Sequence, residues 1–135
     1  MNVFYLKRSK EELSLAMDLF DKMSNSSIKS MLAHLINSMD FIVDFLANRH
    51  SEMIYEYNES KEIIRKFLGN DFLETYFYIK NLSRKEIKVI NNDSIKIVGK
   101  RTEQVNKDFF KSLISKTITF FNMVYEKTER GVIWT

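Results

Sequence analysis

The clearest pattern in the chain lies at residues 28–46, which read IKSMLAHLINSMDFIVDFL. Apolar residues recur there in alternating steps of four and three, which is the spacing of one face of an α-helix. A stripe of this length predicts a core-facing helix of about 30 Å, at about 1.5 Å per residue. The stripe consists of Ile28, Leu32, Leu35, Met39, Ile42 and Leu46, and is widened by Met31, Ile36, Val43 and Phe45.

Few residues outside this stretch would break a helix. The 135 residues include three glycines and no proline, and the first glycine is Gly69. A chain without proline can continue as long helices joined by short polar turns. Gly69, Gly99 and Gly131 each stand where the residue pattern changes, so they mark expected boundaries between elements.

On the N-terminal side, the spacing of Ser9 and Glu12 is typical of a capping box and predicts a helix that starts at Ser9. The polar cluster at residues 24–27 ends this helix and supplies the N-cap of the next one.

On the C-terminal side, we expect a helix over about residues 52–68, with Ile54, Tyr57, Ile64 and Phe67 facing inward. Asn70 or Asp71 would cap a fourth helix that carries Phe72, Tyr76 and Ile79. Residues 87–89 and 95–97 then alternate apolar and charged side chains around an Asn-rich turn, which predicts a β-hairpin with its lysines toward water. A last helix over about residues 102–128 would bury Phe110, Leu113, Ile114, Thr117, Phe121 and Val124.

These elements predict one domain over residues 1–135. Its expected fold is an all-α, up-and-down bundle of about five helices, with one short β-hairpin inserted before the last helix. The last helix and the tail at residues 132–134 carry more apolar surface than a small bundle hides, so we expect a homodimer. A cysteine-free chain with no signal peptide and no apolar run of about 20 residues is expected to be cytoplasmic, without a membrane span.

Motifs for metal, nucleotide or nucleophilic chemistry are absent from the sequence. There is no Glu-x-x-His pair, no Gly-rich phosphate loop and no Gly-x-Ser-x-Gly, so we expect no metal and no cofactor. His34 is interpreted as a half-buried side chain with a satisfied hydrogen bond. Asp40 and Asp44 share one helical face, where a solvated stripe is favoured over paired catalytic carboxylates.

Positive charge is concentrated in residues 80–111, which hold nine basic and four acidic side chains, a net charge of +5. Such a region can attract a polyanion, and the aromatic residues 76–78 could stack on bases. The alternative is a solvated hairpin above ordinary core aromatics. The basic side chains expected to contribute are Lys80, Arg84, Lys88, Lys96, Lys100 and Arg101.

Three stretches, residues 31–40, 76–84 and 101–124, resemble the long early helix, the segment before the variable insert and the last core helix of the HEPN superfamily. That superfamily comprises small helical bundles found in nucleases, toxins and nucleotide-associated proteins. Its ribonucleases carry an Arg and, four to six residues later, a His at the start of the late helix. Arg101 keeps the Arg, whereas Asn106 stands where the His would be, and Asn cannot exchange a proton near neutral pH.

The resemblance therefore implies a non-catalytic or diverged HEPN-like protein, with toxin–antitoxin systems as one possible setting. It would bind RNA, a nucleotide or a partner protein through residues 80–111, with Arg101 and Asn106 as polar site residues. A second hypothesis is a structural or assembly subunit of a protein complex without a nucleic-acid ligand. A third is a HEPN-like ribonuclease that acts without the usual His; binding is favoured over an enzymatic activity.

Overall fold

The computed structural model describes residues 3–49 and 57–127. The predicted mostly-α class is confirmed, because these ranges contain five helices and one small antiparallel sheet of three strands. The helices are α1 (Phe4–Lys22), α2 (Asn25–Arg49), α3 (Tyr57–Phe67), α4 (Asn70–Ser83) and α5 (Lys107–Lys127). The strands are β1 (Glu86–Val89), β2 (Ser94–Val98) and β3 (Glu103–Asn106).

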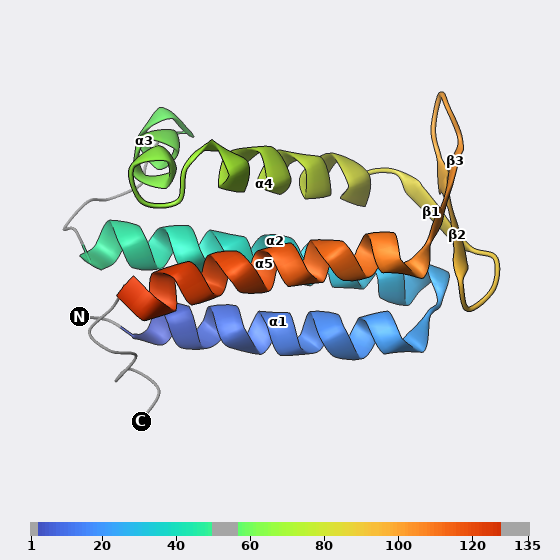
Figure 1. The fold of residues 1–135 in the computed structure, drawn as a ribbon, viewed down its shortest axis with the longest axis horizontal. Helices are drawn as coiled ribbons and strands as arrows, with labels where there is room; N and C mark the ends of the chain where they lie inside the picture. The colour runs from blue at the N-terminus through green and yellow to red at the C-terminus, as the bar shows by residue number, and fades with distance from the viewer. Residues whose placement is uncertain (1–2, 50–56, 128–135) are drawn as a thin grey trace.

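Four helices, α1, α2, α4 and α5, lie roughly along one axis, with α3 at one end of the bundle and the sheet at the other (Figure 1). Helix α2 is the central element, because it contacts all four other helices and β1. Its predicted stripe is buried, and Ile28, Leu35 and Ile42 are fully enclosed. Among the residues described, Asn25–Ala47 is the one segment long and apolar enough to cross a membrane by length and composition, and 56% of it is buried inside the bundle.

The turn between α1 and α2 is built from the predicted serine cluster. Met23 adopts a left-handed conformation at φ 45°, which ends α1. The backbone N–H of Ser27 donates to Ser24 Oγ at 3.1 Å, and the N–H of Ser24 donates to Ser27 Oγ at 2.9 Å. These reciprocal bonds satisfy two backbone donors at the start of α2, which is the physical role of a capping box.

The capping box predicted at Ser9 is wrong. Helix α1 begins at Phe4, because Leu6 is fully buried and packs the first turn into the core. Ser9 therefore lies inside the helix, where it is completely buried against α2. Its Oγ lies 2.9 Å from the carbonyl oxygen of Ser38 and 2.8 Å from Ser38 Oγ. The hydroxyl joins two helices and caps neither.

The expected cap of α4 by Asn70 or Asp71 is also wrong. Gly69 is the N-cap residue, and it makes no side-chain capping bond. Its backbone angles, φ 78° and ψ 179°, lie in a region that side chains rarely adopt, so glycine suits this corner. In α3, Ile64 is buried as predicted. The predictions for Ile54, for the Tyr57 side chain and for the tail at residues 132–134 lie outside the described residues.

Both predicted strand runs are present, and a third strand joins them. β1 pairs with β2 so that Ile87 faces Ile97, and β2 pairs with β3 so that Ile95 faces Val105. The prediction that the last helix begins at about residue 102 is wrong, because residues 103–106 pair with the edge of β2 and α5 begins at Lys107. Unpaired backbone groups on β2 provide this alternative, and pairing them outweighs local helix propensity.

Helix α5 returns along the bundle with the predicted face toward the core. Its buried residues include Phe110, Leu113, Ile114, Thr117, Phe121 and Val124, and also Phe120. Two contacts attach the sheet to the start of α2. Asn25 Oδ1 accepts the backbone N–H of Val89 at 2.6 Å, and Lys29 Nζ donates to the carbonyl oxygens of Ser83 and Lys85, each at 2.6 Å.

Candidate nucleic-acid interface

The sheet end of the bundle carries an exposed excess of positive charge. Between residues 84 and 107 there are seven basic and three acidic side chains, a net charge of +4, and all ten are exposed. The basic ones are Arg84, Lys85, Lys88, Lys96, Lys100, Arg101 and Lys107, and the acidic ones are Glu86, Asp93 and Glu103. The distribution inferred from the sequence therefore corresponds to one end of the molecule.

Lys88 and Lys96 form the centre of this surface. They are direct partners across β1 and β2, and Lys96 faces Gln104 on β3. Because residues directly opposite each other in a sheet share a face, all three lie on the outer, solvent side. Glu86 Oε1 lies 3.8 Å from Lys88 Nζ, but both side chains are more than half exposed, so this pair neutralises little of the local field.

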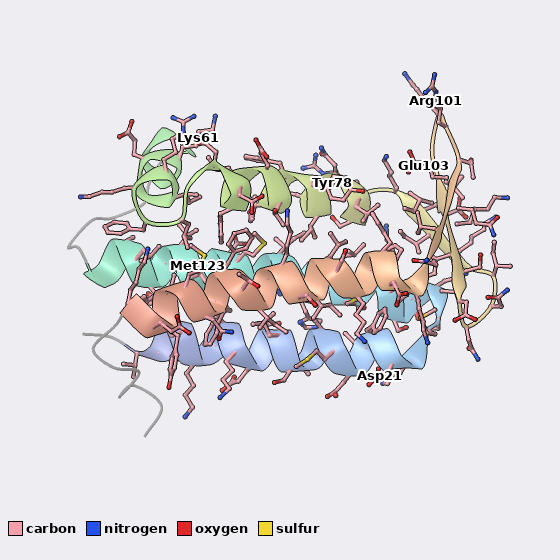
Figure 2. The ribbon with its side chains drawn as sticks, in the orientation of Figure 1. Asp21, Lys61, Tyr78, Arg101, Glu103 and Met123 are labelled. Atoms are coloured by element: carbon pink, nitrogen blue, oxygen red, sulfur yellow. The ribbon has the colours of Figure 1, made fainter. Side chains whose placement is uncertain are left out.

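The other predicted site residues are spread around the sheet. Arg84 follows the last turn of α4, and Lys100 lies in the β2–β3 turn. Figure 2 shows Arg101 at the tip of the ribbon formed by β2 and β3, beyond α4. Asn106 lies at the other end of β3, where its Oδ1 accepts the backbone N–H of Phe109 at 3.2 Å and caps α5.

The structure thus brings Lys88 and Lys96 together and separates Arg101 from Asn106. Thr102 and the first three residues of β3 stand between them, and those three residues alone span roughly 10 Å. The two residues would share one helix in the arrangement that the HEPN resemblance implies. Here one is in a turn and the other is a helix cap.

The aromatic residues near the basic surface do not form a stacking platform on it. Tyr76 donates its hydroxyl to Asp40 Oδ1 on α2 at 2.8 Å. Tyr78 lies on a different side of α4 and packs edge-on against Phe109, with ring centroids 6.2 Å apart. Neither ring belongs to the outer sheet face, whose row consists of Lys88, Lys96 and Gln104.

Two polar clusters join side chains from different helices, and these contacts between helices were not apparent from the sequence. In the first, Glu12 Oε2 on α1 contacts His34 Nδ1 on α2, and Arg8 lies 3.8 Å from Glu12 Oε1. The Glu12 side chain is only 9% exposed, so His34 supplies a partner that a buried carboxylate requires. The predicted half-buried, hydrogen-bonded state of His34 is confirmed. Its partner Glu12 could not be predicted from the sequence, because the two residues are 22 positions apart.

The second cluster lies between α2 and α4. Desolvation raises the pKa of Asp40, although the Tyr76 hydroxyl and the Lys80 charge act in the opposite direction. Burial, followed by repulsion from Asp40, raises the pKa of Asp44. Both carboxylates remain exposed on one side, as the solvated-stripe interpretation requires, but helix packing removes part of their hydration. Across residues 3–49 and 57–127 there is no group of three side chains suited to hold a metal ion.

A groove of about 390 Å³ lies between α4 and α5. Its lining consists of Asp71, Glu74, Thr75, Tyr78, Ser112, Leu113 and Lys116. At one end, Lys116 Nζ lies 3.2 Å from Asp71 Oδ1 and 3.5 Å from Thr75 Oγ1. An exposed ion pair therefore lies at the Asp71 end of the groove, while Tyr78 lies further along α4, toward the sheet.

Comparison with known protein families, with curated proteins and with solved structures finds no match to this chain.

Proposed function

We propose that this protein is a non-catalytic, HEPN-like binding protein that holds the phosphate backbone of RNA on the outer face of its sheet. The observation that carries the proposal is the cross-strand pair of Lys88 and Lys96 within an exposed end of net charge +4. Arg84 and Lys100 extend the same positive region. The proposal includes a cytoplasmic location for the protein. It also includes the up-and-down helical bundle that the HEPN resemblance implies.

The chemistry of the surface favours backbone contacts over base recognition. Lysine ammonium groups attract phosphates as point charges and release condensed counterions when they bind. Base stacking needs an exposed aromatic ring, and the outer row of the sheet provides only lysine and glutamine side chains. We therefore expect binding with little sequence preference and a strong dependence on salt.

Catalysis is not part of the proposal. A HEPN-like ribonuclease needs its Arg and its proton-transfer residue close together on the late helix. Arg101 lies at the ribbon tip, and Asn106 is occupied in capping α5. Asn106 is assigned a structural role for this reason.

Fluorescence anisotropy with a labelled single-stranded RNA, over a series of salt concentrations, tests the proposal. The logarithm of the association constant should decrease with the logarithm of the salt concentration. In the variant Lys88→Gln/Lys96→Gln this negative slope should be shallower by about 1.4, because each lost phosphate contact removes about 0.7. The matched control is Lys7→Gln/Arg65→Gln, because both residues are exposed and lie toward the opposite end of the bundle. Absent binding, salt-independent binding or equal effects of the two variants would contradict the proposal.

A second candidate, a structural subunit of a protein complex, is favoured by the outward side of α1. Phe4 is 55% exposed and Leu15 is 46% exposed, and both face the same side of α1, since residues eleven apart are about three helical turns apart. Co-purification from native extract with the wild type, and its loss with Leu15→Lys, would support this candidate over RNA binding.

A further inference from the structure

The ring of Tyr78 is an exposed aromatic surface inside the α4–α5 groove. It is 46% exposed, and Phe109 packs against it edge-on from α5. Glu74 lies one helical turn earlier on the same face of α4 and lines the same groove. Burial, followed by the negative charge of Glu103 on β3, raises the pKa of the Tyr78 hydroxyl. Glu74 is therefore the carboxylate that lines the groove beside the ring.

At the Tyr78 end of the groove, the carboxylate of Glu74 has no basic partner within the lining. Lys116, the basic residue of the lining, is held by Asp71 at the other end. Within the described part of the chain, Glu74 and Glu103 form no ion pair. An aromatic face with a neighbouring carboxylate attracts a cation, both through the ring quadrupole and through direct charge pairing.

The turn between β2 and β3 carries a cation, the guanidinium of Arg101, that suits an aromatic ring beside a carboxylate. Residues 99–102 form the turn between β2 and β3, and Lys100 and Arg101 are both exposed there. Figure 2 shows Arg101 projecting from the tip of the ribbon, clear of the helices. Arg101 forms no ion pair with any other described residue. A guanidinium can stack on an aromatic ring and bond a carboxylate at the same time.

We propose that the α4–α5 groove receives the β2–β3 turn of a second copy of this chain. Arg101 of one copy would lie on Tyr78 of the other, with its guanidinium paired to Glu74. In a two-fold dimer the contact occurs twice, because each copy offers one turn and one groove. This interface goes beyond the proposed RNA-binding function. It uses the β2–β3 turn, which includes Lys100, and it leaves the central pair Lys88 and Lys96 free on the outer sheet face.

Sedimentation velocity over a range of protein concentrations, at low and high salt, tests the proposal with the full chain. The wild type should form a dimer that weakens as salt rises. Arg101→Glu and Glu74→Arg should each raise the dimer dissociation constant by about tenfold or more, because every substitution removes two contacts per dimer. The double variant carrying both substitutions should recover part of the association, because it restores the charge pair between positions 101 and 74 but not the stacking of a guanidinium on Tyr78.

Lys7→Glu is the control, an exposed charge reversal on α1 that should leave the dimer unchanged. Far-UV circular dichroism shows whether each variant keeps its helices. A wild type that stays monomeric at low salt overturns the proposal. It is equally overturned by a dimer that tolerates both single variants, or by a folded double variant that associates no more tightly than either single variant.

Discussion

The sequence and the structure lead to opposite predictions about how substitutions of Ser9 affect the stability of the fold. As an N-cap it would be exposed at a helix start and could be replaced by Asp with little effect on stability. In the structure it is fully buried, and its hydroxyl lies 2.8 Å from Ser38 Oγ and 2.9 Å from the Ser38 carbonyl oxygen. Substitution at this position therefore tests the packing of α1 against α2.

The expected magnitudes follow from these contacts. Ser9→Ala leaves the Ser38 hydroxyl without its partner in a dry interface, which should lower the free energy of unfolding by about 1–2 kcal/mol. Ser38→Ala should cost a similar amount. The double alanine variant removes both polar groups, so its cost should be smaller than the sum of the two by about 1 kcal/mol. Ser9→Asp would bury a carboxylate beside a carbonyl oxygen and should cost several kcal/mol.

Urea unfolding followed by far-UV circular dichroism measures all four variants. A loss of about 1.5 kcal/mol moves the midpoint by roughly 1 M if the slope is about 1.5 kcal/mol/M. Additive effects of the two alanine substitutions, or a Ser9→Asp variant as stable as the wild type, would refute the buried pair and favour the N-cap interpretation.

Three further predictions concern a cap, a backbone angle and a carboxylate. Asn106→Ala should cost about 1 kcal/mol in urea unfolding by removing the cap on the Phe109 N–H, whereas Asn106→Asp should keep stability; an equal loss in both would argue against the cap. Gly69→Ala should lower stability by about 1–3 kcal/mol, measured by thermal unfolding, through backbone strain alone, because an added Cβ meets no atom within 4 Å. Burial and Asp40 raise the pKa of Asp44 above 3.8, so the folded state binds this proton more tightly than the unfolded state and ionisation disfavours folding. Asp44→Asn should therefore be more stable than the wild type near neutral pH, and this advantage should shrink as pH falls toward 3.8; a pH-independent difference in urea midpoints would contradict it.

Much of the helical architecture could be predicted from local pattern. The stripe of α2 and the inner face of α5 are buried where the periodicity places them, because a helix that buries one face must repeat its apolar residues at helical spacing. The serine cluster at residues 24–27 forms a helix start as expected. The alternation in β1 and β2 correctly assigned Lys88 and Lys96 to the wet face.

The candidate sites were less accessible to sequence reasoning, because each is assembled from distant segments. Glu12 and His34 are 22 residues apart and meet only when α1 packs on α2. The α4–α5 groove is lined by Tyr78 from α4 and by Ser112, Leu113 and Lys116 from α5. The spacing of Arg101 and Asn106 suggested one helical motif, but Arg101 lies in the turn before β3 and Asn106 is the last residue of that strand.

The sequence by itself determined which segments are amphipathic and where positive charge gathers, since both properties depend on the order of side chains along the chain. Tertiary structure alone decided the role of Ser9 and the state of residues 103–106. The Ser9 hydroxyl found its partner 29 residues away, and β3 formed because the edge of β2 offered unpaired backbone groups. Hydrogen bonds of this kind depend on which elements pack against each other in the folded chain. The local propensity of a segment contains no information about its packing partners.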